Sequence, residues 1–213
     1  MSLTLLSQLY AVKCGTTLFH QLQDATLNSN VQDLIETPVG STMPLFNANN
    51  GERPEVTFGT HQLKTALTLC GVAGGSGGVA KLFGRKVVNL TGPAAVGGSV
   101  HYSWTSAASL ALINQISAGN RQRAQAQMRV LFLKSGATAA LTYAGTATLD
   151  AYTTAVENFV LGPIVIDGAV IEGTNDFTLS FNPAVEEPDD DYETEPVFAA
   201  VRATQPVISF STT

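Results

Sequence analysis

The chain has 213 residues, of which 45% are hydrophobic and only 13% are charged, against about 25% charged in an average soluble domain. This composition excludes a disordered polyelectrolyte and suits a single β-rich domain, residues 1–213, with a full core. The net charge of −6 comes from one stretch: 7 of the 17 acidic residues lie in 186–195, and the remainder has 10 acidic and 11 basic residues. No basic stripe with interleaved aromatics is present, which argues against sequence-specific binding of nucleic acid.

Targeting and cysteine signals are weak. Cys14 and Cys70 are too few for a disulfide framework or a zinc site. Residues 1–13 lack the basic start of a signal peptide, and no apolar run approaches the ~20 residues of a membrane span. We therefore expect a reducing compartment, no membrane, and release, if any, by a non-secretory route such as assembly into a particle.

Short extended segments dominate the chain. Each is rich in Val, Ile, Thr, Phe or Tyr and is bounded by Gly, Pro or Asn, which is typical of strands. The predicted strands are 10–19, 54–58, 85–90, 99–104, 127–134, 158–171, 176–181, 197–203 and 206–210. Within 158–171, Asp167-Gly168 between two apolar runs predicts a tight hairpin.

Two segments have a helical pattern. Thr60 can cap a helix over 61–71, in which Leu63, Ala66, Leu67 and Cys70 share a face and Gly71 ends it. Apolar spacing predicts a second helix over 105–119. Residues 149–159 fit a helix or a strand equally well. The predicted fold is mainly β, a β-sandwich or small barrel of short antiparallel strands, with one or two flanking α-helices.

The sequence also repeats itself. Residues 24–60 laid over 176–212 without a gap give eleven identities in 37 positions, and "RPEVTFGT" and "QPVISFST" are the clearest pair. This similarity indicates a duplicated strand–loop–strand unit; the alternative is two similar β-hairpins that arose by chance.

The glycine-rich loop 71–80 fits no catalytic motif. Lys81 lacks the spacing of a phosphate-binding loop, and Ser76 lacks the preceding strand of a nucleophile elbow. We interpret the segment as a flexible assembly loop. Its glycines are Gly71, Gly74, Gly75, Gly77 and Gly78.

The acidic stretch lies in an inter-strand loop, 183–195. Its acidic residues are Glu186, Glu187, Asp189, Asp190, Asp191, Glu193 and Glu195. The stretch does not match the pattern of an EF-hand calcium loop. Thr194 occupies the position that requires glycine, and Ala200 occupies the position of the final Glu. We expect a solvated or partner-facing charged connector between two strands.

No other residues form a recognisable site. His20, His61 and His101 have no second ligand at metal spacing and are expected to be structural or surface residues. The carboxylates Asp150, Glu157, Asp167 and Glu172 have no motif around them. We predict no metal, no cofactor and no enzymatic activity.

Several stretches together resemble the virion structural proteins of tailed bacteriophages, and among them the tail tube, or major tail, proteins. They are "PLF…ERPEVTFGTHQLKTAL", "VHYSWTSAASLAL", "VLGPIVIDGAVIEGTNDFTLSFN" and the terminal "QPVISF". The resemblance covers about two thirds of the chain and lies in strand texture. The glycine-rich and acidic loops are not among the matching features.

The resemblance implies a subunit that assembles with itself into rings, hexameric or pseudo-hexameric, stacked into a hollow tail tube. Its other partners would be further tail proteins, and DNA would pass without specific binding. The protein would belong to the virion tail and be assembled in the host cytoplasm. The acidic loop would face the lumen, where it repels DNA, or the exterior, where it discourages aggregation. The alternatives are a capsid decoration or other head-associated protein and a β-sandwich binding module.

Overall fold

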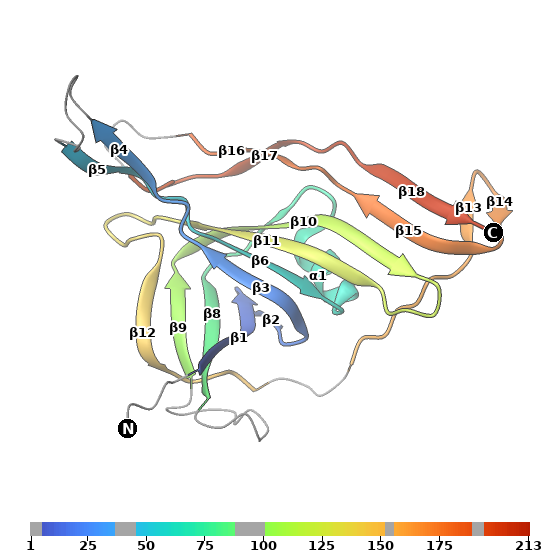
Figure 1. The fold of residues 1–213 in the computed structure, drawn as a ribbon, viewed down its shortest axis with the longest axis horizontal. Coiled ribbons are helices and arrows are strands. Elements are labelled where there is room, and N and C mark those ends of the chain that lie inside the picture. Colours follow the sequence, from blue (N-terminus) through green and yellow to red (C-terminus); the bar gives the residue numbers. More distant parts are fainter. Residues whose placement is uncertain (1–5, 37–45, 88–100, 152–155, 189–193) are drawn as a thin grey trace.

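The computed structural model describes residues 6–36, 46–87, 101–151, 156–188 and 194–213. Most described residues lie in antiparallel strands, and the described part of the chain contains a single helix (Figure 1). The predicted fold class, a mainly β structure with a flanking helix, is confirmed.

Two sheets form the body of the molecule. The five-stranded sheet has the order β12 (Thr142–Ala147), β9 (His101–Ser106), β8 (Ala80–Val87), β1 (Leu6–Cys14) and β2 (Thr17–Phe19). The second sheet, called here the long sheet, has the order β18 (Val207–Thr212), β15 (Thr174–Ser180), β10 (Ala108–Gly119), β11 (Gln125–Leu133), β6 (Glu55–Thr60) and β3 (Leu22–Asn28). A short strand, β7 (Gly75–Ser76), also pairs with β10.

Three two-stranded hairpins project from this body. They are β4 (Gln32–Glu36) with β5 (Phe46–Gly51), β13 (Ile164–Ile166) with β14 (Ala169–Ile171), and β16 (Ala184–Glu186) with β17 (Ala200–Ala203). The β13–β14 hairpin turns at Asp167-Gly168, where both residues have positive φ (48° and 79°). The predicted tight turn is therefore confirmed, because such a pair of φ values defines the favoured two-residue hairpin loop.

The main core lies between the two sheets. The inner face of the long sheet, meaning the face toward the five-stranded sheet, supplies Phe58 and Met128, while the five-stranded sheet supplies Phe19 and Leu82. All four side chains are at most 1% exposed, and the rings of Phe19 and Phe58 lie 5.5 Å apart. Burial of large apolar side chains of this kind, at about 25 cal/mol per Å², is the main stabilising contribution.

The predicted helix over 105–119 is wrong, because these residues form the end of β9 and the whole of β10. A bulge between Ile113 and Gln115 places Ile113 and Ile116 on the same inner face. In a regular strand two residues three apart would face opposite sides, so the bulge produces the spacing expected of a helix. Leu110 and Leu112 lie on the other face, in a separate apolar cluster.

The first predicted helix is confirmed but shorter. Helix α1 runs over Leu63–Cys70, and Gly71 (φ 56°) donates its N–H to the carbonyl of Leu67 at 2.8 Å. Thr60 ends β6, and its hydroxyl accepts from the N–H of Gln62 at 3.1 Å without capping the helix itself. Ala66 and Cys70 are buried in the main core, whereas Leu67 is 41% exposed.

Other predicted strands differ in extent. Residues 10–19 contain the end of β1, a turn at Gly15 and β2, and 158–171 is extended only in its hairpin. Residues 149–151 and 156–159, in the segment left open between helix and strand, belong to neither. The remaining parts of these predictions, at 88–90, 99–100 and 152–155, lie outside the described residues.

Candidate assembly surface

The two similar sequence segments have the same architecture. Strand β3 pairs with β6 around the β4–β5 hairpin, and β15 pairs with β18 around the β16–β17 hairpin. The registers agree at the 152-residue offset: Leu27 lies opposite Val56, and Leu179 lies opposite Ile208. In both segments the first strand has a register shift near its start, so the two units match in irregular detail as well as in strand order.

One asparagine in each unit holds the base of its hairpin extension. Asn30 (φ 48°) donates from its side chain to the carbonyl of Arg53 at 3.0 Å, and Asn182 (φ 45°) donates to the carbonyl of Gln205 at 3.2 Å. Asparagine tolerates this left-handed conformation better than most residues. The identity Asn30/Asn182 in the sequence therefore corresponds to one structural role.

The long sheet has an unpaired edge on each side. Within the described residues, β3 pairs only with β6 and β18 pairs only with β15. Every residue of β18 is exposed. Exposed edges of this kind are templates for pairing with another chain.

The outer face of the long sheet, turned away from the five-stranded sheet, has two parts. At one end Leu112 and Leu131 pack against Val201 of β17, and the other end carries amide and hydroxyl side chains. Gln127, Gln115 and Ser180 lie opposite one another on three adjacent strands. Gln125, Ser117, Thr178 and Ser209 form a second such row across four strands. They alternate with inner-face residues such as Ile116 and Leu179, so the polarity follows the pleat of the sheet.

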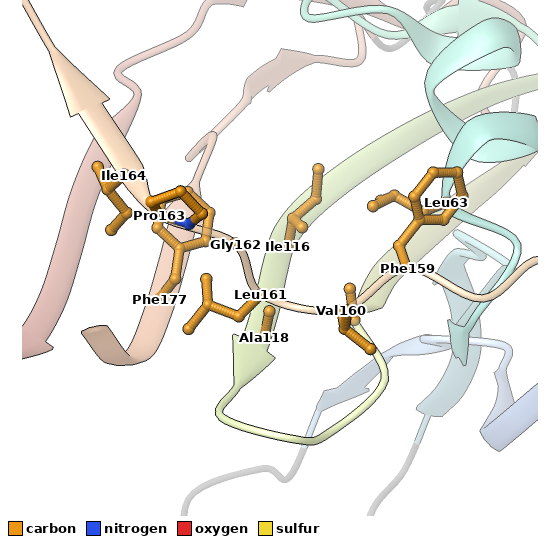
Figure 2. Close-up of a pocket in the computed structure, with 11 residues that line it drawn as sticks. Leu63, Ile116, Ala118, Phe159, Val160, Leu161, Gly162, Pro163, Ile164 and Phe177 are labelled. Carbon is orange, nitrogen blue, oxygen red and sulfur yellow. The ribbon is translucent and has the colours of Figure 1, made fainter. Parts of the chain in front are cut away.

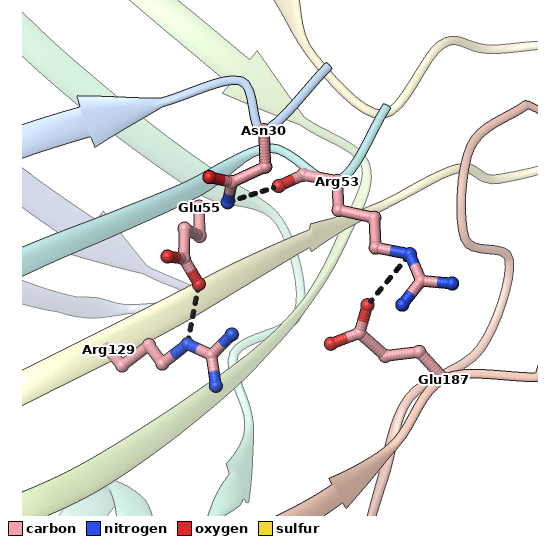
Figure 3. A network of polar contacts seen from close by, with 5 residues as sticks. All are labelled: Asn30, Arg53, Glu55, Arg129 and Glu187. Carbon is pink, nitrogen blue, oxygen red and sulfur yellow. Dashed lines mark hydrogen bonds and ion pairs between the residues drawn. The ribbon is translucent and has the colours of Figure 1, made fainter. Parts of the chain in front are cut away.

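Charge is sparse on the long sheet. Arg129 is the only basic residue on its strands, and its Nε lies 2.5 Å from a carboxylate oxygen of Glu55 (Figure 3). The Asp176 carboxylate accepts from the hydroxyl of Ser211 at 3.1 Å. The outer face thus presents no unpaired cation from these strands.

Three acidic residues of the run, Glu186, Glu187 and Glu195, are described, and they lie in the β16–β17 extension. Glu187 forms an ion pair with Arg53 at 3.8 Å (Figure 3). Glu195 accepts from the N–H of Ala140 at 3.1 Å. Glu186 ends β16 and is exposed. The other predicted acidic residues, Asp189, Asp190, Asp191 and Glu193, lie outside the described residues. At least two acidic residues of the run are therefore anchored to the body.

The glycine-rich loop is held against β10. Gly77 donates its N–H to the carbonyl of Ser109 at 2.9 Å, and the Ser109 hydroxyl donates to the carbonyl of Gly78 at 3.0 Å. A Cβ on Gly75 would lie 2.0 Å from the carbonyl oxygen of Leu69, so close approach of the backbone requires glycine there. The predicted assembly role of this loop stays a prediction, but the segment is a packed connection between α1 and β8 and not a free arm.

A segment at 157–164, called here the strap, crosses the end of the main core. The Glu157 carboxylate accepts from the backbone N–H of Lys64 at 2.7 Å and from the N–H and hydroxyl of Thr65, all at the start of α1. The backbone carbonyl of Phe159 accepts from Ala124 at 2.7 Å. Glu157 thereby caps a helix whose own N-cap residue, Gln62, provides no side-chain cap.

Beside the strap lies an open apolar groove of about 370 Å³. Figure 2 shows Phe159 and Leu63 facing each other at one end, and Pro163 beside Phe177 of β15 at the other. Polar side chains are absent among the residues that line it. The groove therefore offers no polar side chain to orient a small-molecule substrate.

Two of the three histidines, His61 and His101, have structural positions. His101 is fully buried in β9, and His61 Nδ1 lies 2.9 Å from the carbonyl oxygen of Ala124. Burial raises the pKa of both Cys14 and Cys70 to about 12, so neither thiol is a ready nucleophile. Among the described residues, no three His, Cys, Asp or Glu side chains gather as metal ligands would.

No protein-family profile matches the chain, and no curated protein matches it. Across the described ranges, no helix has the length and apolar character needed to cross a membrane. Any functional conclusion therefore rests on the long sheet and its surfaces.

Proposed function

We propose that the protein is a structural subunit that self-associates into rings, which stack into the tail tube of a bacteriophage virion. The observation that carries this proposal is the long sheet, which has two unpaired edges and whose outer face has no unpaired basic side chain from its strands. The sequence resemblance to tail tube proteins supports the same function. In this role the chain has no enzymatic activity, and its partners are other copies of itself and further tail proteins.

The two edges are suited to a closed ring. Strands alternate in direction across the sheet, so β3 and β18, at opposite ends of six consecutive strands, run in opposite directions. When a rotation brings the β18 edge of one copy to the β3 edge of the next, the new pair is antiparallel like all the others. Repetition of this head-to-tail contact closes a barrel and removes both free edges.

The hairpin extensions favour stacking along the ring axis. Strands β3 and β15 run in the same direction, so β4–β5 and β16–β17 leave the same end of the long sheet (Figure 1). The two extensions contact each other, because Glu52 donates its N–H to the carbonyl of Thr194 at 2.6 Å. In a ring, every copy would project this pair toward the same neighbouring ring.

The outer face suits a conduit for DNA. Phosphate contacts made by Lys and Arg dominate affinity for DNA, and the one basic residue on these strands is paired with Glu55. A lumen lined by glutamine, serine and threonine would let the polyanion pass without holding it. Glu187, paired to Arg53, then lies at the ring's end, and the orientation of the acidic loop toward lumen or exterior stays a prediction.

Negative-stain electron microscopy of the purified protein tests the proposal. The expected result is rings or tubes with a central channel, formed at increasing protein concentration. Monomers or trimers with no tubular state would overturn it, and addition to a capsid lattice without self-stacking would instead favour a head decoration protein.

A further inference from the structure

The inner face of the long sheet is apolar across its width, but the part of the chain that packs on this face leaves β18 exposed. Ile208 is 55% exposed and Phe210 is 38% exposed. Their equivalents in the first unit, Val56 and Phe58, are 0% and 1% exposed. The same two positions are thus buried in one repeat and open to solvent in the other.

The direction of the side chains is fixed by the register. Ile208 lies opposite Leu179, which lies opposite Ile116, and both Ile116 and Leu179 belong to the main core. Phe210 lies opposite Phe177, two residues before Leu179 on the same face. Ile208, Phe210 and Phe177, called here the open patch, therefore continue the inner face beyond the covered core.

In the first unit the cover comes from the chain itself. Phe19 of β2 lies against Phe58, with 5.5 Å between ring centroids. The described residues contain one five-stranded sheet, and its side chains share the main core with residues of β6, β11 and β10. On the second unit the strap approaches Phe177 through the apolar groove, and both Ile208 and Phe210 remain exposed.

We infer that the open patch is a docking surface for a second copy of this chain, which approaches with its β3 edge along β18. This inference rests on the proposed function and assigns the contact that would close the ring. Strand β2 ends at Phe19 and β3 begins at Leu22, so a copy that adds its β3 brings β2 with it. The five-stranded sheet of the incoming copy, to which its β2 belongs, then covers Ile208 and Phe210 of the first copy. Strand pairing at the edge and burial of the apolar face therefore occur together.

Coupling of the two contacts gives the interface its specificity. Edge hydrogen bonds alone would accept any extended strand, whereas the open patch needs an apolar layer beside that strand. The antiparallel direction of β3 and β18 satisfies the first requirement, and the β2–β3 connection satisfies the second.

Matched substitutions on the two faces of β18 test this inference. Ile208→Thr with Phe210→Thr removes apolar surface from the open patch, and Val207→Thr removes it from the outer face, where Val207 is 53% exposed. Threonine favours strands, so the edge is retained in both variants. All three side chains are exposed in the single chain, so thermal melts of dilute protein should agree among the variants.

Association is measured by light scattering coupled to size-exclusion chromatography over a range of concentrations. We expect the double variant to weaken self-association by about tenfold or more, as for loss of buried interface anchors, and Val207→Thr to leave it unchanged. Hydrogen exchange should show that association protects backbone amides of β18 and of β3.

Three outcomes would contradict the inference. Association that is equally strong in the double variant, or protection that is missing from β3 or β18, would overturn the docking surface while leaving ring formation intact. A wild-type chain that stays monomeric at every concentration would overturn the proposed function as well.

Discussion

At the scale of single residues, Glu157 connects two parts of the chain that are far apart in sequence. Replacement by alanine removes the acceptor for the first N–H groups of α1. We expect Glu157→Ala to lower the free energy of unfolding by about 1 kcal/mol, the usual effect of losing an N-cap. Urea unfolding measures it. Glu172→Ala, at an exposed carboxylate in the same half of the chain, is the control and should change stability by less than about 0.5 kcal/mol; equal effects would contradict the capping role.

The buried side chain of His101 should make the stability of the protein depend on pH. Neither of its ring nitrogens has a hydrogen-bond partner, and burial, followed by the nearby positive charge of Arg85, lowers its pKa. The unfolded chain, with a histidine pKa of about 6.5, then binds a proton that the folded chain resists. Stability should therefore fall as pH drops below about 6.5. His101→Phe, which keeps an aromatic ring beside Tyr10, should flatten the pH dependence of the melting temperature between about 7.5 and 5.5; an unchanged slope would show that other groups control it.

At the scale of elements, the repeat predicts matched responses from Asn30 and Asn182. Alanine at either position keeps the positive φ only with strain and loses the side-chain hydrogen bond, whereas glycine loses only the bond. Alanine should cost about 1–2 kcal/mol, and more than glycine, at each position. Chemical unfolding of the four single variants checks this order; glycine as costly as alanine would mean that the left-handed conformation contributes nothing.

The elements that sequence predicts best are those whose signals are local. The Asp167-Gly168 turn, α1 and the strands β6, β15 and β18 follow from residues next to one another. β10 was mistaken for a helix because a single bulge at Ile113–Gln115 changes which residues share a face. The cap from Glu157 is equally hidden, since 93 residues separate it from the amide of Lys64. The sequence indicates that the acidic run joins two strands, but not that Glu187 is paired with Arg53, because that contact forms only when the two extensions pack together.

At the scale of the whole molecule, the two repeats meet different surroundings. The first unit is covered by the five-stranded sheet, and the second leaves Ile208 and Phe210 exposed. Because the described residues provide a covering sheet for only one of the two similar units, the other keeps an apolar surface available to its neighbours.

The last prediction concerns the surface that DNA would meet in an assembled tube. Gln115→Lys with Gln127→Lys places two positive charges side by side on the outer face of the long sheet, where the wild type has amides. If this face lines the lumen, DNA release from assembled particles should become slower, and added salt should restore the rate, because phosphate contacts weaken steeply with salt. Fluorescence of DNA leaving single particles measures the rate. Thr148→Lys with Ala151→Lys adds the same charge at exposed positions after β12, off the long sheet, and should leave release unchanged. Slower release in the control variant, or an unchanged release rate in the outer-face variant, would mean that a different surface faces the DNA.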